Sequence, residues 1–383
     1  MRRQVTAGAS PAQGRAAQRA PRRKPRRRLA YSGGREFQEA LRARVDHYFE
    51  ESGVRRRDRW NWYFKAASIL LLFGASYTLL VFFASAWWQA VPLAVVLALS
   101  VTGIGFNIMH DGGHGAVSRH RAVNRAMART LDVVGGSSYL WRFKHGVFHH
   151  HFANIVGHDT DIALGPLARF APHEPRYFHQ RWQHWYIWAL YGLMAAKWQF
   201  VDDFRTLFRG RIGPHPIPRP RGVELAWLVA LKLVFFTLAF VIPLLLHPLW
   251  AVALIYALFA VVLGLALSIV FQLAHCVEEA DFPLVADDAR VIDNAWAVHQ
   301  LQTTVNFCRD NRFATWLLGG LNYQIEHHLF PEICHSNYAA IAGLVRETCG
   351  EFGIAYREHA SFWSGIRSHM RWLKRMGAPA VAG

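Results

Sequence analysis

Long apolar stretches alternate with polar, cation-rich segments along the 383-residue chain. A helix needs about 20 apolar residues to cross a bilayer, and four stretches reach that length, at approximately residues 66–87, 90–109, 224–246 and 249–271. Because only short turns separate the members of each pair, the pattern predicts two tight helical hairpins. The expected fold class is an all-α integral membrane protein with four transmembrane helices.

The distribution of cations predicts how these hairpins are oriented. The turns around Gln89 and Pro248 contain no Arg or Lys, and of the 43 cations only Lys232 falls inside a predicted span. Lys and Arg concentrate on the cytoplasmic side of membrane proteins. We therefore expect both termini, the loop between the hairpins and a helical cap on the cytoplasmic side, with the bacterial inner membrane as the location.

Two segments of the long loop have patterns of their own. Residues 182–200 mix tryptophans with Gln, His and Lys, which favours a helix lying in the membrane interface over a fifth span. Residues 210–222 are rich in Pro and Gly, so we expect a non-helical lead into the third span.

A large part of the formal net charge of +17 lies at the amino-terminal end of the chain. Residues 1–35 contain many cations and no acid, and such a segment cannot bury enough apolar surface to fold. We expect a disordered tail near anionic lipid rather than a nucleic-acid partner, then a membrane domain over residues 36–360 and a basic C-terminal tail over 361–383. The four cysteines lack metal-type spacing, which indicates reduced thiols without disulfides.

Histidines gather near the predicted cytoplasmic ends of the spans. Two of the clusters contain pairs at i, i+4 spacing, which places both rings on one face of a helix. The clusters are His110 and His114; His145, His149 and His150; His275 alone; and His327 with His328.

Each cluster is weak evidence by itself, but the predicted topology places all four on one side of the membrane. Eight imidazoles at one depth would repel each other if protonated and would be poorly solvated if neutral, and bound metal resolves both problems. Eight nitrogens are too many for one ion, so the count fits two metals. Imidazole suits Fe, Cu, Zn and Ni; an apolar substrate beside a bilayer favours iron with dioxygen.

The three boxes H-x-x-x-H, H-x-x-x-H-H and Q-x-x-H-H, with the isolated His275, resemble those of the membrane fatty-acid desaturase family. The resemblance covers roughly residues 60–350, and segments 141–162, 271–279 and 324–331 are similar to its front-end or linoleoyl-CoA-type branch. It implies a di-iron centre, O2 as oxidant, a long-chain acyl substrate in a kinked hydrophobic tunnel, and an electron-transfer partner.

By position, the resemblance implies as iron ligands and catalytic residues His110, His114, His145, His149, His150, His275, His327 and His328. Gln324 stands where many branches have His and is a candidate weak ligand, His299 is a candidate ligand or neighbour of one, and His151 is a poor candidate. Four carboxylates are candidates to accept ring N–H bonds, namely Asp111, Asp159, Asp161 and Glu326.

The resemblance also bears on the electron donor and on competing functions. The H-P-G-G haem motif of cytochrome b5 fusions is missing, so we expect a separate donor, of ferredoxin or cytochrome b5 type with its reductase. The expected function is O2-dependent desaturation of a long-chain acyl-CoA or acyl-lipid, giving a cis double bond. The nearest alternative is a lipid, sterol or carotenoid hydroxylase; a metal transporter fits less well, because the spans lack a central acid or histidine.

Overall fold

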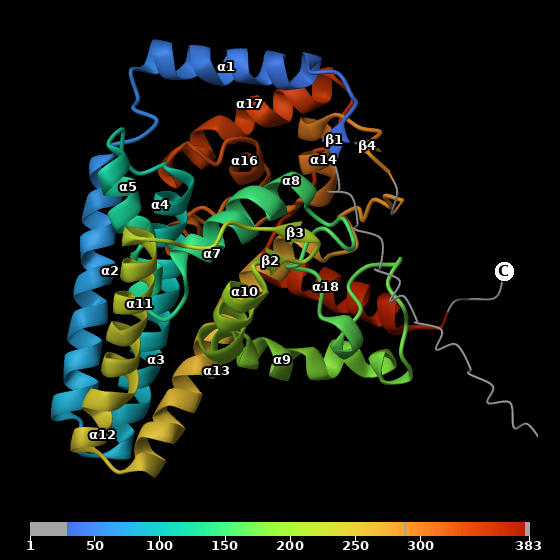
Figure 1. Cartoon of the computed structure of the whole chain (residues 1–383). Coiled ribbons are helices and arrows are strands. Elements are labelled where there is room, and N and C mark those ends of the chain that lie inside the picture. Colours follow the sequence, from blue (N-terminus) through green and yellow to red (C-terminus); the bar gives the residue numbers. More distant parts are fainter. Residues whose placement is uncertain (1–28, 287–288, 380–383) are drawn as a thin grey trace, which may run out of the picture.

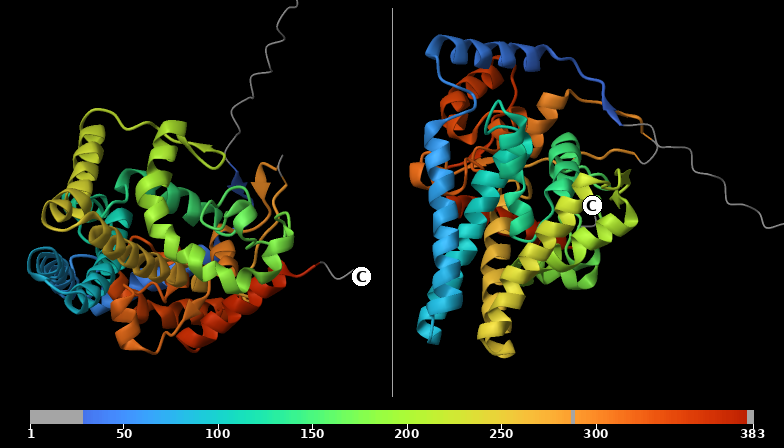
Figure 2. Two further views of the ribbon diagram at one scale, coloured as in Figure 1. Left: turned by 90° about the horizontal axis from the view of Figure 1, so that it is seen from below. Right: turned by 60° about the vertical axis from the view of Figure 1, so that its left-hand side comes forward.

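The computed structural model describes residues 29–286 and 289–379, and the chain in these ranges is mostly helical (Figure 1). Four long apolar helices project from one side of a helical cap, as the right-hand view of Figure 2 shows. This confirms the predicted fold class and the number of spans. The histidine boxes lie at the junction of spans and cap.

The four spans overlap the predicted stretches. The first begins earlier and ends at Phe83 instead of residue 87, and the third agrees to within one residue. The second and fourth helices continue past their apolar cores, because backbone hydrogen bonding does not stop where hydropathy falls, and these extensions carry His110, His114 and His275. The spans are Trp60–Phe83 (α2, Trp60–Thr78, and a π turn Leu79–Phe83), Trp87–His114 (α3, Trp87–Gly103; a π turn Ile104–Met109; α4, His110–His114), Val223–Leu246 (α11, Val223–Phe236; a π turn Thr237–Val241; α12, Ile242–Leu246) and Leu249–His275 (α13).

Side-chain hydrogen bonds tie the two hairpins together near their turns. The Gln89 side chain accepts from the backbone N–H of Ser85 (3.0 Å), which fixes the first turn. His247 Nε2 donates to the Val81 carbonyl at 2.7 Å, and Tyr77 Oη donates to the Leu238 carbonyl at 2.9 Å. Unpaired polar groups are costly in hydrocarbon, so these bonds stabilise the pairing of the hairpins.

The loop between the hairpins forms part of the cap and a transverse helix. Its short helices are α5 (Arg121–Ala128), α6 (Thr130–Val133), α7 (Ser138–Phe143), a π turn Lys144–His149, α8 (His150–Phe152), 3-10 turns Gly165–Leu167 and Phe178–Trp182, α9 (Gln183–Lys197), a π turn Trp198–Asp202 and α10 (Asp203–Arg209).

Helix α9 corresponds to the predicted interfacial helix. It runs across the direction of the spans (Figure 1) and is not one of the four spans found in the described residues. It packs closely on α13 at Gly264, where an added Cβ would lie only 2.4 Å from the Tyr191 carbonyl oxygen. The predicted non-helical lead is a small hairpin of β2 (Arg211–Ile212) and antiparallel β3 (His215–Pro216).

The rest of the cap comes from segments at both ends of the chain. Helix α1 (Glu36–Ser52) lies over α17 (Tyr338–Glu351), and both cover α16 (Gln324–Leu329) (Figure 1). The remaining helices are α14 (Trp296–Thr303), α15 (Arg312–Leu317), a 3-10 turn His335–Asn337 and α18 (Phe362–Gly377). Strands β5 (Asn306–Phe307) and β6 (Glu358–His359) pair in parallel.

The two predicted tails are shorter than the sequence suggests. Residues 1–28 lie outside the described residues, but strand β1 (Ala30–Tyr31) pairs in parallel with β4 (Val291–Ile292), and Leu29 is buried. At the other end, α18 packs its Trp372 ring on Phe282, with centroids 4.8 Å apart. Residues 29–35 and 362–377 therefore belong to the folded domain, because each contributes apolar side chains to its core.

Lys232, a cation within the third span, has partners supplied by the long loop. Its Nζ donates to the Gly135 carbonyl at 2.6 Å and lies 3.0 Å from Asp203 Oδ2, with both side chains buried. The sequence offers no sign of this ion pair, because Asp203 is 29 positions away. It joins α11 to the loop beside the bundle.

Replacing Lys232 by Met should destabilise the fold strongly, because Asp203 would remain as a buried, unpaired charge. The expected loss is about 3–5 kcal/mol, measured as a lower midpoint of thermal unfolding in detergent. The matched control is Lys197→Met, which removes an exposed ion pair with Asp202 and should cost at most about 1 kcal/mol. Equal shifts for the two variants would contradict the structural role of Lys232.

Candidate metal centre and substrate cavity

The eight box histidines lie where helices end or change pitch. His110 and His114 bound α4, directly after a π turn; His275 is the last residue of α13. A second π turn, Lys144–His149, carries two more histidines. Such turns are rare and occur mostly at functional sites.

The glycines of the first box allow this packing. A Cβ on Gly112 would lie 2.5 Å from the Ala128 backbone nitrogen, and one on Gly113 would lie 2.1 Å from the Trp141 ring. Any side chain at these positions would push α4 away from α5 and α7. Trp141 in turn stacks on His145 with ring centroids 4.6 Å apart, which holds the second box against the first.

The structure brings all eight predicted ligands into two adjoining groups. The first group is His110, His114, His145 and His327, and one ring nitrogen of each lies within 4.8 Å of the others. The second group is His149, His275 and His328, whose ring nitrogens meet the same limit. His150 lies between the two groups, with its Nε2 at 3.3 Å from His145 Nε2.

Several buried, inward-facing nitrogens have no hydrogen-bond partner among the residues that the structure describes. Nε2 of His114, His149, His327 and His328 is in this state. An unsatisfied buried polar atom costs about 1–3 kcal/mol, and a shared metal ion would remove that cost. The residues present therefore fit a metal centre.

Protonation states agree with this arrangement. Burial, followed by the neighbouring imidazoles, lowers the pKa of His145, His150, His327 and His328 well below the ordinary histidine value. Burial also acts to lower the pKa of His149, but Asp159 outweighs it and the pKa is raised. Four neutral rings are in the form that binds metal.

The outer nitrogens of the second group are held by hydrogen bonds. His149 Nδ1 donates to Asp159 Oδ2 at 3.0 Å, and His275 Nδ1 donates to the Thr303 carbonyl at 3.1 Å. His328 Nδ1 donates to Gln300 Oε1 at 2.8 Å. Such bonds fix the tautomer that leaves Nε2 free to bind metal. Of these three acceptors only Asp159 was predicted from the sequence, because Thr303 and Gln300 belong to no recognisable motif.

The other predicted carboxylates have different partners. Asp161 is 3.9 Å from His149 Nδ1 but pairs with Lys144 Nζ at 2.6 Å. Asp111 follows His110 on α4 and accepts from Nδ1 of His335, at 2.8 Å.

Glu326 also differs from the expectation, since it accepts from Asn306 Nδ2 and Tyr356 Oη, both at 2.8 Å. Burial raises the pKa of Glu326, against the effect of these two donors. Its neighbours in the chain, His327 and His328, face the two histidine groups, so the carboxylate faces the opposite side of the short helix α16.

The three remaining candidate ligands, Gln324, His299 and His151, lie in different positions relative to the histidine groups. Gln324 Nε2 lies 3.1 Å from His275 Nε2, at the edge of the second group. His299 donates from Nε2 to the Ala153 carbonyl at 3.0 Å, and neither it nor His151 belongs to the ligand groups found in the described residues. Both rings lie beside Tyr31, with centroids 5.4 and 5.3 Å from it.

A cavity of about 290 Å³ with a mostly apolar lining adjoins the two groups. Its wall includes His110, His145 and Gln324, and it extends between α3, α9 and α13. The lining also contains two ion pairs, Lys144 with Asp161 and Lys197 with Asp202. This amphipathic lining can hold a hydrocarbon chain next to the histidines.

Comparisons with known proteins agree with this reading. The profile of the family described as "Fatty acid desaturase" matches residues 85–360. The sn-1 linoleoyl-lipid 6-desaturase of Arthrospira platensis is 39% identical over 346 residues, covering 89% of this chain and 92% of that protein. The enzyme of the same name from Synechocystis sp. is 35% identical over 355 residues, with 91% and 98% covered.

A plant relative extends the comparison. The acyl-lipid (8-3)-desaturase of Physcomitrium patens is 34% identical over 346 residues, which cover 89% of this chain and 72% of that protein. The family profile and these long alignments all include the three histidine boxes. The chain thus belongs to the fatty acid desaturase family, with a front-end-like sequence, and is a membrane-embedded fatty acyl desaturase.

Proposed function

We propose that the eight histidines hold two iron ions, with which the enzyme uses O2 to introduce a cis double bond into a long acyl chain of a membrane lipid. The observation that carries the proposal is the set of buried, unpaired imidazole nitrogens beside an apolar cavity. One ion would be held by the group around His110 and the other by the group around His275, with His150 between them. Iron with dioxygen supplies an oxidant able to remove hydrogen from an unactivated C–H bond.

The residues around the ions would position the chain and keep water away. Phe106, Phe271 and Leu267 line the cavity beside the histidines and exclude solvent from the reacting carbons. Desaturation needs two neighbouring carbons held to within about an ångström. Gln324 lines the same cavity beside His275, so its amide is placed to fix the chain or to contribute a weak carbonyl ligand.

The substrate we propose is a lipid-linked linoleoyl-type chain, with the new bond at carbon 6. Support comes from the names of the two cyanobacterial relatives, whose alignments cover nearly their full lengths. The pairs Lys144–Asp161 and Lys197–Asp202 provide a polar boundary for the ester end of the chain. Electrons would come from a separate ferredoxin or cytochrome b5 type donor that docks on the cationic cap.

Expression in a host fed linoleic acid tests this function directly. Fatty acid methyl esters from separated lipid classes should contain a product with one additional double bond at carbon 6, and His328→Ala should give none. Hydroxylated chains would favour the hydroxylase alternative. Product found first in acyl-CoA rather than in lipid would contradict the proposed carrier.

The proposed topology places both termini and the histidine centre in the cytoplasm and the two hairpin turns outside. Reporter fusions at Gln89 and Pro248 should therefore give an external signal, and fusions at Arg211 and Gly383 an internal one. The reason is the absence of Arg and Lys from both turns. An internal signal at Gln89 would contradict the orientation.

Purified protein should contain two irons per chain. Replacing His114, His150 or His328 by Ala should abolish turnover and lower the iron content, because each removes a buried nitrogen from a ligand group. His120→Ala is the matched control, since this histidine is exposed and lies outside the boxes. Stoichiometric zinc in fully active protein would exclude the redox role.

Asp159 and Asp161 provide a matched pair for the hydrogen bond to His149. Asp159→Asn should weaken iron binding by about 10–100-fold, because the carboxylate that orients the ring becomes a neutral amide. Asp161→Asn should have a smaller effect, since its carboxylate pairs with Lys144. Iron titration with chelator competition measures both, and equal losses would contradict the assignment.

A further inference from the structure

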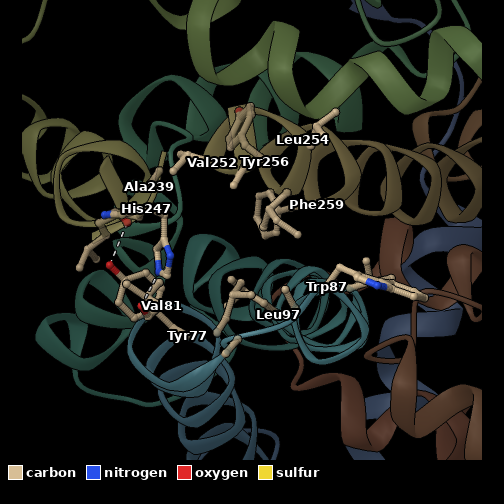
Figure 3. Close-up of a pocket in the computed structure, with 18 of the residues that line it drawn as sticks. Tyr77, Val81, Trp87, Leu97, Ala239, His247, Val252, Leu254, Tyr256 and Phe259 are labelled. Carbon is tan, nitrogen blue, oxygen red and sulfur yellow. Dashed lines mark hydrogen bonds between the residues drawn. The ribbon is translucent and has the colours of Figure 1, made fainter. Parts of the chain in front are cut away.

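Helix α13 is held in different ways at its two ends. In its first half it borders an apolar cavity of about 450 Å³ between the hairpins, across which Phe259 faces Leu97 of α3 (Figure 3). Its last residue is His275, a member of the second histidine group. Apolar contacts are non-directional, whereas the residues of a metal site must be held to within about 0.5 Å. The end of the helix at His275 therefore needs directional bonds.

The carbonyl groups at this end receive hydrogen bonds from distant parts of the chain. A helix leaves its last four carbonyls without partners inside the helix. The His275 carbonyl accepts from Asn154 Nδ2 at 2.9 Å. The next carbonyl, that of Cys276, accepts from His369 Nδ1 at 2.6 Å. Side chains from the long loop and from α18 thus cap the helix at the position of the histidine.

The Asn154 amide also contacts the group that orients the His275 ring. Its Nδ2 lies 3.1 Å from the Asp281 carbonyl oxygen and 3.4 Å from the Thr303 carbonyl oxygen. The Thr303 carbonyl is the acceptor for the ring N–H of His275, at 3.1 Å. One side chain therefore contacts both the backbone of His275 and the acceptor that fixes its ring.

The backbone of Asn154 reaches the support of another histidine in the same group. Its N–H donates to Asp159 Oδ2 at 3.1 Å, and the same oxygen accepts from His149 Nδ1 at 3.0 Å. Asn154 has φ +58° and lies at the turn that brings Asp159 back to His149. Asn adopts this left-handed conformation more readily than most residues. Asn154 is thus bonded to the supports of His149 and His275 at once.

The surroundings determine which way the Asn154 amide points. Its Nδ2 faces three carbonyl oxygens, which can only accept hydrogen bonds. Its Oδ1 is buried and has no hydrogen-bond partner among the described residues. An unsatisfied buried acceptor and a left-handed non-glycine residue both cost free energy, and backbone strain of this kind occurs mostly at functional sites. The contribution of the side chain is therefore its N–H groups.

Residues of the first histidine group are supported elsewhere. Trp141 stacks on His145 with ring centroids 4.6 Å apart, and His327 Nδ1 donates to Tyr338 Oη at 3.3 Å. The hydrogen bonds of Asn154 reach neither of these supports. A change at Asn154 should therefore act on the second group and leave the first in place.

We propose that Asn154 is the positioning residue of the second metal site. Its amide fixes the backbone and ring of His275, and its N–H fixes the carboxylate that orients His149. It touches no reacting atom and acts through these two histidines. The inference rests on the function proposed above and deepens it by naming the residue that keeps one of the two iron ions bound.

Two substitutions separate the side chain of Asn154 from its backbone. Asn154→Gly keeps the left-handed turn and the N–H to Asp159 but removes the amide, and Asn154→Asp places an oxygen against the three carbonyls. Each should weaken the binding of one iron by about 10–100-fold, so that chelator competition leaves about one iron per chain. If Asn154 served only the turn, Asn154→Gly would bind iron like the wild type. That result would overturn the proposal.

Mössbauer spectra of protein loaded with isotopically enriched iron identify which ion is lost. The two groups contain four and three histidines, so the two ions should give distinct components. The Asn154 variants should lose one component and retain the other. His369→Gln is the matched control, because it removes the donor to the Cys276 carbonyl and should retain both. Equal loss of both components in the Asn154 variants, or the same selective loss in His369→Gln, would overturn the proposal.

The two proposals fail in different ways. Wild-type protein that binds two irons but forms no desaturated product contradicts the proposed function, whatever the Asn154 variants bind. Wild-type protein that desaturates linoleoyl lipid, together with an Asn154→Gly variant that keeps both irons at wild-type affinity, contradicts the inference alone.

Discussion

The structure depends on keeping many imidazoles buried, neutral and correctly oriented at the end of an apolar bundle. A neutral ring offers metal only one nitrogen, and its other nitrogen must donate a hydrogen bond or remain unsatisfied. Asp159, Thr303 and Gln300 provide acceptors for the second ligand group. Asp159 comes from the long loop, and Thr303 and Gln300 both come from α14, so these two parts of the cap must pack on the bundle before the site can form.

Buried polar groups within the bundle also need hydrogen-bond partners. Lys232 in α11 is satisfied by Gly135 and Asp203, and Gln199 is satisfied by Val134 and Tyr256. Breaking either set would leave polar groups buried beside the cavities. These bonds fasten the loop at Val134 and Gly135 to α11 and to the π turn Trp198–Asp202, beside the cavity that adjoins the histidines.

Much of the fold was predictable because hydropathy acts over long, uniform segments. Four spans, the transverse helix and the non-helical lead followed from composition alone, and the spacing of the boxes identified eight histidines that the structure brings together. What could not be predicted depends on contacts between distant segments. The ion pair of Lys232 with Asp203 and the bond from His328 to Gln300 are examples, since neither pair has a local signal.

The two predicted tails show where composition gives the wrong result. Composition marks residues 29–35 and 362–377 as basic and polar, yet Leu29 and Trp372 are buried. A single apolar residue can anchor a polar segment when the domain offers a complementary pocket, and a compositional average over the segment hides it. Charge density therefore did not predict the residues at which the folded domain begins and ends.

The π turns connect the membrane part of the enzyme with its chemistry. A regular α-helix presents one stripe to a neighbour, but the second span must face the bundle with Val101 and then the other histidines with His110 and His114. A π turn accommodates one additional residue through i→i+5 bonding, and Ile104–Met109 lies between these two parts of the span. It changes the phase of the helix, so that Val101 and His110 both line the cavity beside the histidine groups. A poorer hydrogen-bond geometry in one turn is thus offset by placing the apolar wall of the cavity next to the histidines.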